Sequence, residues 1–210
     1  MYSDRENIQA LVLRTVPSGE NSKKIKIISP SKGIIRIYVP GGAKLSSSML
    51  SLTIPFTVSD LEIKATTSAY ILTGGEQKIH FSSINNNYDV LLITTHIVRF
   101  TEKLENIFED WSSIYSQFYI TLYYLNEAAN DNDIEAAKRY TVIHYLNMLI
   151  LFNSGLRHTN SQELTKWFNN FEVLDVKSRL ELNIPEDLIK TLQGYIFNEF
   201  FVLFNIKIVF

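Results

Sequence analysis

The chain has 210 residues, 46% of them hydrophobic and 20% charged, and its formal net charge is −2. This balance excludes wholesale disorder, and the length allows one large or two small domains. The absence of cysteine excludes disulfides, thiolate zinc sites and cysteine nucleophiles. The longest apolar run, residues 142–152, is too short to span a bilayer, and the polar first residues do not suggest a signal peptide. We therefore expect a soluble cytoplasmic protein with no membrane association.

The first 80 residues predict short β-strands joined by tight turns. The five strand-like runs are residues 10–17, 24–28, 34–39, 53–63 and 66–73. Hydrophobic residues alternate within them, and the alternation flips at Ser59–Asp60, which predicts a β-bulge or a bend. Gly74–Gly75 predicts a turn that ends the last run. Five such runs with Gly, Pro and Ser turns fit a small barrel of the OB type.

The hydrophobic period becomes helical after residue 87. The helical patterns cover residues 90–107, 111–125, 133–148, 164–171 and 185–196. Asp133 is the expected N-cap of the third helix, whose broad apolar stretch predicts the central helix of a bundle. The sequence therefore predicts the α+β class, with an N-terminal five-stranded OB-fold barrel at residues 1–80 followed by an all-α helical domain at residues 81–210.

Charge is distributed unevenly between these two parts. Through residue 64 the chain carries nine basic and five acidic residues, whereas the remainder carries 11 basic and 17 acidic residues. A small basic β-domain attached to an acidic remainder predicts polyanion binding by one end of the protein.

The DNA-contacting residues that we expect lie on the strands and turns of the basic part. They are Arg14, Lys23, Lys24, Lys26, Lys32, Arg36, Tyr38 and Lys44. Each lysine or arginine that neutralises a phosphate releases counterions, and Tyr38 is on the face of Arg36, where it can stack on a base. The alternative is that the lysines serve solubility and block strand-edge pairing.

No catalytic or metal-binding pattern is visible in the sequence. The four histidines lack metal-ligand spacing, and no Gly-x-Ser-x-Gly nucleophile motif is present. Residues 41–44 lack the spacing of a phosphate-binding loop. We expect a protein that is not an enzyme and that needs no metal or cofactor. An enzyme with a site hidden from sequence patterns is a third, weaker alternative.

The order of residues in the N-terminal part resembles the RecO family of recombination mediators. The matching features are residues 11–15, 19–20, 25–30, 32–33, 42–44 and 54–57. A weaker match in the helical part is Lys138-Arg139-Tyr140, followed by two leucines. The resemblance implies a DNA-binding OB domain, a helical domain and no catalytic reaction.

The resemblance also implies partners. It implies binding and annealing of single- and double-stranded DNA, and help in loading RecA onto strands coated by single-strand-binding protein, together with RecR and sometimes RecF. Lys138, Arg139 and Tyr140 would then flank a groove for the acidic, phenylalanine-ending tail of single-strand-binding protein. The alternative for these residues is a solvated helix face with local ion pairs to Asp133 or Glu135.

The chain departs from the family pattern in two places. Many members carry a cysteine zinc module after the central helix, whereas residues 155–182 contain no cysteine. Residues 40–48 contain only Lys44 where the family has a dense basic run. The main prediction is a RecO-like recombination mediator in DNA repair. The alternative is a non-enzymatic protein-interaction adaptor with an OB fold and weak or no DNA binding.

Overall fold

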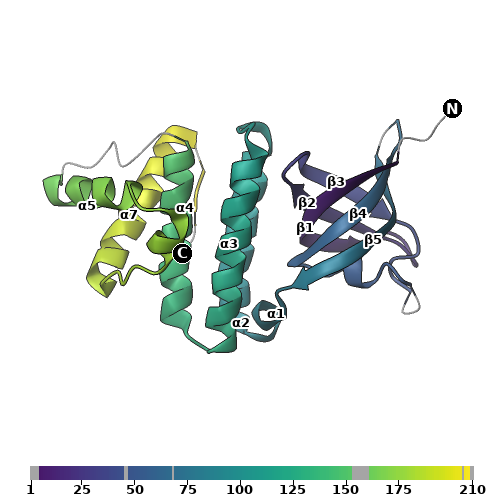
Figure 1. Ribbon diagram of the computed structural model, residues 1–210, viewed down its shortest axis with the longest axis horizontal. Helices are drawn as coiled ribbons and strands as arrows, with labels where there is room; N and C mark the ends of the chain where they lie inside the picture. The colour runs from purple at the N-terminus through teal and green to yellow at the C-terminus, as the bar shows by residue number, and fades with distance from the viewer. Residues whose placement is uncertain (1–4, 45–46, 68, 153–160, 205, 209–210) are drawn as a thin grey trace. The chain divides into compact units, whose positions relative to one another are not determined.

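A computed structural model describes the chain except residues 1–4, 45–46, 68, 153–160, 205 and 209–210 (Figure 1). The chain forms two compact units. The barrel unit comprises Met1–Ser82 and Ile107–Ser116, and the helical unit comprises Ser83–Asn106 and Gln117–Phe210. The α+β class is confirmed. The segment Ile107–Ser116 belongs with the barrel, whereas the sequence placed it in the helical domain.

Five strands close into a barrel in the order β1-β2-β3-β5-β4. The strands are β1 (Arg5–Pro17), β2 (Lys23–Ser29), β3 (Gly33–Val39), β4 (Thr57–Ala65) and β5 (Tyr70–His80). Neighbouring strands are antiparallel except for β3 and β5, which are parallel. A short 3-10 helix, η1 (Ser51–Thr53), lies between β3 and β4. The predicted five-stranded OB-type barrel is therefore present.

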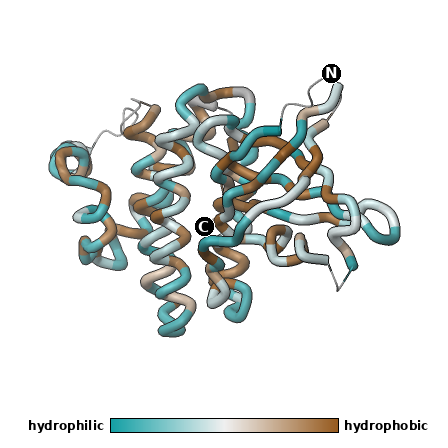
Figure 2. Tube along the Cα trace, turned by 45° about the vertical axis from the view of Figure 1, so that its right-hand side comes forward, coloured by the Kyte–Doolittle hydropathy of each residue, from teal (hydrophilic) through white to brown (hydrophobic). Residues whose placement is uncertain are grey.

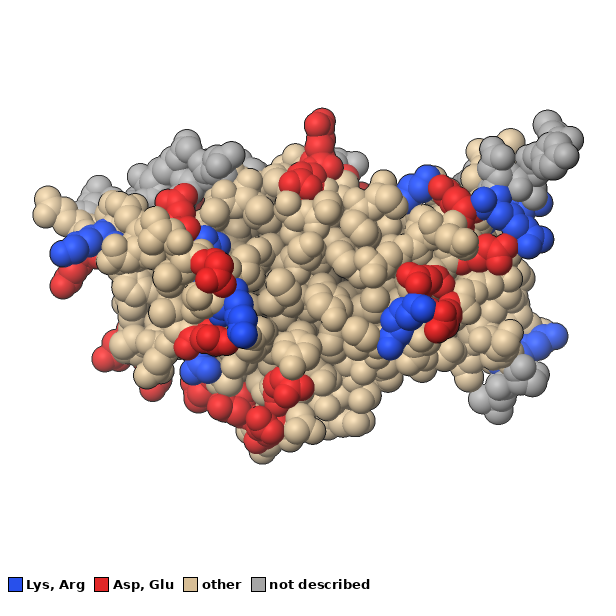
Figure 3. Space-filling model, viewed as in Figure 1, with Lys and Arg blue, Asp and Glu red and all other residues tan. Residues whose placement is uncertain are grey.

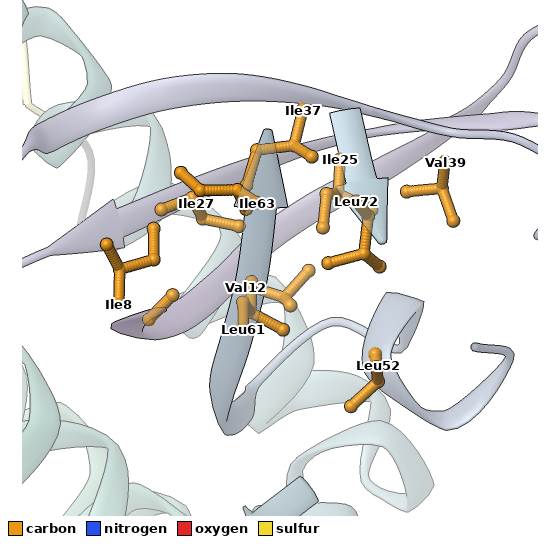
Figure 4. Packing of buried hydrophobic residues seen from close by; sticks show 11 residues of the cluster. Ile8, Val12, Ile25, Ile27, Ile37, Val39, Leu52, Leu61, Ile63 and Leu72 are labelled. Atoms are coloured by element: carbon orange, nitrogen blue, oxygen red, sulfur yellow. The ribbon is translucent and has the colours of Figure 1, made fainter. Parts of the chain in front are cut away.

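Alternating side chains fill the interior of the barrel (Figure 4). The buried cluster consists of Ile8, Ala10, Val12, Ile25, Ile27, Ile37, Val39, Leu52, Leu61, Ile63 and Leu72. Hydrophobic and hydrophilic positions follow one another along the strands in Figure 2. In β1 the register against β2 shifts between Val12 and Arg14. This bulge reverses the alternation, so Val12 is buried in the core while Arg14 and Val16 are exposed.

The sequence prediction that Gly74–Gly75 ends the last strand is wrong, because β5 continues through both glycines to His80. A Cβ atom on Gly75 would lie 2.6 Å from the carbonyl oxygen of Asp60. Glycine therefore permits a close approach of two backbones within the sheet rather than a turn. The register between β4 and β5 also shifts between Val58 and Ser59, where the sequence alternation flips.

The helical unit is built around α4, whose residues 141–149 are all buried. The helices of the chain are α1 (Ser82–Asn86), α2 (Tyr88–Lys103), α3 (Trp111–Asn130), α4 (Ile134–Leu151), α5 (Gln162–Glu172), α6 (Val176–Leu180) and α7 (Glu186–Phe204), with a 3-10 helix η2 (Leu104–Asn106). Asp133 caps α4 as predicted, since its carboxylate accepts a hydrogen bond of 2.8 Å from the backbone N–H of Ala136. In the described part of the chain, no helix combines the length and the apolar character that crossing a membrane requires.

Candidate nucleic-acid interface

Three cations from adjacent strands stand side by side on the outside of the barrel. Arg14 of β1 is the register partner of Lys26 of β2, and Lys26 is the register partner of Arg36 of β3. Directly opposed residues on neighbouring strands have Cβ atoms only about 5 Å apart. Arg14, Lys26 and Arg36 therefore form a continuous row of positive charge, which we call the basic row.

The basic row and Lys24 line a groove of about 270 Å³, which we call the basic groove. Val16 and Ile25 complete its lining. Lys24 precedes Lys26 by two residues and therefore shares its face of β2. Lys24 and the two arginines are exposed, whereas Lys26 is only 7% exposed. Arg14, Lys26 and Arg36 also make further interactions within the protein.

Tyr38 lies next to the basic groove, but its hydroxyl forms a hydrogen bond with a different part of the barrel. It is the register partner of Lys24 and is half-buried. Its hydroxyl donates a hydrogen bond of 2.8 Å to Oγ of Ser22, just before β2. The ring is therefore held towards the β1–β2 hairpin.

The structure places the remaining predicted contact residues away from the basic groove. Lys23 donates a hydrogen bond of 3.1 Å to Oγ1 of Thr53. The ammonium group of Lys32 lies 2.9 Å from Glu6, and its hydrogen bond to this carboxylate raises the pKa of Lys32. Lys44 is exposed in the turn region after β3. The structure thus gathers four of the eight predicted residues into one site.

A second groove, of about 350 Å³, is acidic and lies on β1, β4 and β5. Its lining residues are Asn7, Ile8, Gln9, Asp60, Glu62, Gly75 and Glu76. All three of its carboxylates are paired with cations, since Arg5 lies 2.9 Å from Glu62, and Lys78 lies 2.5 Å from Glu76 and 3.4 Å from Asp60. Figure 3 shows acidic and basic side chains beside each other over β4 and β5. The summed charge of residues 1–64 does not show that the barrel has one basic and one acidic face.

The three predicted partner-binding residues lie in α4, and one of them, Tyr140, contacts a tyrosine of α3. The ammonium group of Lys138 lies 2.7 Å from the carboxylate of Glu135, which is the local ion pair of the alternative interpretation. The Arg139 guanidinium lies 5.2 Å from the centre of the Tyr140 ring. Tyr140 in turn lies 5.1 Å from the ring of Tyr124. We call Arg139, Tyr140, Tyr124 and the neighbouring Tyr123 the tyrosine patch.

The sequence did not point to Tyr123 and Tyr124 as members of this patch. Tyr123 is 49% exposed, and its ring centre lies 5.5 Å from that of Tyr124. Burial, followed by the negative charge of Glu181, raises the pKa of Tyr124. The available signal was two consecutive tyrosines in a helix, of which at least one had to face away from the core.

Among the residues that the structure describes, no three histidine or carboxylate side chains lie close enough to hold a metal ion together. Part of the segment at residues 155–182, where the family's zinc module would lie, is outside the described residues.

A closed five-stranded barrel in this strand order, with a basic groove across β1, β2 and β3, defines a protein of the OB-fold class. Residues 3–78 match the sequence model of the family described as "Recombination protein O N terminal". The DNA repair protein RecO of Oceanobacillus iheyensis is 26% identical over 121 residues, which cover 58% of this chain and 47% of the relative. The N-terminal part of the chain is therefore similar to the N-terminal domain of the RecO family. The chain matches about half the length of this curated relative.

Proposed function

We propose that this protein acts in DNA repair and recombination as a RecO-like mediator that binds DNA through the basic groove. The observation that supports this proposal is the alignment of Arg14, Lys26 and Arg36 across three strands, with Lys24 beside them. A groove with four cations favours phosphate groups and attracts any nucleic-acid strand regardless of sequence.

The proposed activity is binding without a chemical step. We propose that the protein binds single- and double-stranded DNA, anneals complementary strands and helps to load RecA onto strands coated by single-strand-binding protein, in the cytoplasm. The proposed protein partners are RecR, single-strand-binding protein, and RecF in some settings. The relative's description as a DNA repair protein supports this pathway.

The tyrosine patch is the proposed contact for single-strand-binding protein. Arg139 combines a positive charge with an aromatic neighbour, which suits a peptide that ends in an aromatic residue and a carboxylate. The Nε atom of Arg139 is buried and has no hydrogen-bond partner in the described part of the chain. The ion pair between Lys138 and Glu135 makes Lys138 the weaker member of the predicted set.

Fluorescence anisotropy with labelled single-stranded DNA at several salt concentrations tests the basic groove. Four phosphate contacts predict that log affinity falls against log salt with a slope of about −3. The triple variant Lys24→Glu, Lys26→Glu, Arg36→Glu should lose this binding. The double variant Lys24→Glu, Arg36→Glu avoids the nearly buried Lys26 and should show the same loss while remaining folded.

Lys64→Glu is the matched control, because Lys64 lies on β4 and does not line the basic groove. Each Lys→Glu or Arg→Glu change alters the net charge by the same amount, and Lys64→Glu should lower the affinity for DNA much less than the changes in the basic groove do. If the unmodified protein, the double variant and Lys64→Glu bind DNA equally well, the basic groove is not the DNA site. If the unmodified protein binds no DNA at any salt concentration, the adaptor alternative is favoured.

A further inference from the structure

We infer that the basic groove binds the sugar–phosphate backbone of a nucleic-acid strand and does not read its bases. This inference rests on the proposed function and specifies the part of the nucleic acid that the groove contacts. Of the six lining residues, four are lysine or arginine and the other two are aliphatic. Lysine and arginine side chains donate hydrogen bonds and accept none. Their bonds to charged phosphate oxygens are about twice as strong as bonds between neutral groups.

None of the described residues that line the groove is aromatic, whereas OB-fold proteins usually stack bases on aromatic side chains. Strands β1, β2 and β3 contain a single aromatic residue, Tyr38. Tyr38 is the register partner of Lys24 but is not part of the groove lining. Its hydroxyl is engaged by Ser22 at 2.8 Å, and the ring is half-buried. A base in the groove therefore meets no exposed ring among its lining residues.

The cations are distributed as a strip rather than a single point. The basic row crosses three strands, and Lys24 lies about 6.6 Å further along β2 in the next row. Val16, which is 44% exposed, is the register partner of Lys24 and offers an apolar contact beside that charge. A strip of positive charge with an apolar margin matches a chain of phosphates joined by sugars better than it matches one isolated anion.

Backbone contact and base stacking predict different affinities for a strand that lacks bases. In proteins that stack bases, each base contributes roughly 5- to 150-fold in affinity. A groove that contacts only the backbone keeps its affinity when the bases are removed. It also shows the same salt dependence with and without bases, because the phosphate contacts are unchanged.

The test compares two single strands of about 12 nucleotides, one of thymidines and one with abasic sugars throughout, by anisotropy with the full chain. The expected dissociation constants differ by less than about fivefold, with equal salt slopes. A thymidine strand that binds fivefold tighter or more overturns the inference and leaves the proposed function intact. If neither strand binds, the proposed function fails as well.

Variants of Tyr38 provide a second, independent readout. Tyr38→Phe removes the hydrogen bond to Ser22 and keeps the ring, whereas Tyr38→Ala removes both. Each variant should bind the thymidine strand within about threefold of the unmodified protein. A large loss with Tyr38→Ala and none with Tyr38→Phe would mean that the ring stacks on a base.

Competition establishes which form of nucleic acid supplies the backbone. Unlabelled single-stranded DNA and unlabelled duplex DNA are each titrated against the labelled abasic strand. Displacement by either competitor supports a shared site for the backbone. Failure of both to displace the abasic strand contradicts the inference.

Discussion

In the helical unit, the Nδ1 atom of His144 lies 3.0 Å from the Oγ1 atom of Thr121, and both side chains are buried. The Thr121 hydroxyl donates its single proton to the carbonyl oxygen of Gln117 at 2.8 Å. The Nδ1–H group of His144 must then donate to Thr121, which leaves Nε2 as an acceptor. Within the described residues, Nε2 has no hydrogen-bond partner. Burial lowers the pKa of His144 to about 3.

Because His144 stays neutral in the folded protein, we expect the free energy of unfolding to decrease as the pH falls from about 6.5 towards 3. In that range the unfolded chain takes up a proton at His144 and the folded chain does not, so acid favours unfolding. The contribution of this residue is about 1.4 kcal/mol for each pH unit below 6.5. Urea denaturation at about pH 7, 6 and 5 measures the slope.

His144→Leu separates this effect from the titration of carboxylates. The variant removes the titrating ring and leaves Thr121 with its hydrogen bond to Gln117. Its stability should therefore depend less on pH than that of the unmodified protein. An identical pH dependence in the two proteins would show that His144 is not responsible.

The sequence could predict features that depend on the local alternation of residues within one strand. It could not predict features that depend on pairing with another part of the chain. The outward face of Lys24, Lys26 and Arg36 follows from period-two patterning, and the register of β2 and β3 agrees with it. The bulge before Arg14 depends on pairing with β2, which no local pattern encodes. Lys32 was grouped with the same site, yet it pairs with Glu6, a residue 26 positions earlier in the chain.

The contact between Gly33 and Trp111 gives a second prediction. Gly33 has φ of +66°, and a Cβ atom there would lie 2.6 Å from Nε1 of Trp111. Gly33→Ala should lower the free energy of unfolding by about 2–4 kcal/mol, because positive φ strain and a clash add together. Gly19→Ala is the control, since Gly19 has φ of +77° but no atom within 4 Å of its Cβ position. Chemical denaturation that finds equal losses in both variants would exclude a role for the Trp111 contact.

Arg179 gives a third prediction, about the part of the helical unit that follows α4. It is 7% exposed and donates hydrogen bonds to the carbonyl oxygens of Phe171 at 3.0 Å and Glu172 at 2.6 Å, and to Oδ1 of Asn147 at 2.9 Å. Arg179 thus connects the end of α5 to α4 and α6. Arg179→Ala should lower the free energy of unfolding by about 3 kcal/mol, because three acceptors, two of them in buried hydrogen bonds, lose a charged donor.

Two further variants test whether the fork geometry of Arg179 matters. Arg179→Lys should also destabilise the protein, because a single ammonium group does not reproduce the planar guanidinium fork. Lys177→Ala is the control, as its exposed ammonium lies 3.8 Å from Glu181 and should contribute less than about 1 kcal/mol. Hydrogen exchange of the α5 amides should increase in both Arg179 variants. Unchanged exchange would contradict the proposed connection.

The tyrosine patch gives the last prediction. A synthetic acidic peptide that ends in phenylalanine should bind the full chain, and Arg139→Glu should weaken this binding by about tenfold or more, because the peptide carboxylate then meets a negative charge. Tyr140→Ala should also weaken it, since Tyr140 lies between Arg139 and Tyr124. Lys166→Glu, an equal charge change on the exposed side of α5, is the control and should have little effect. Isothermal titration calorimetry provides the affinities. Equal weakening by Arg139→Glu and Lys166→Glu would mean that the peptide responds to overall charge rather than to the tyrosine patch.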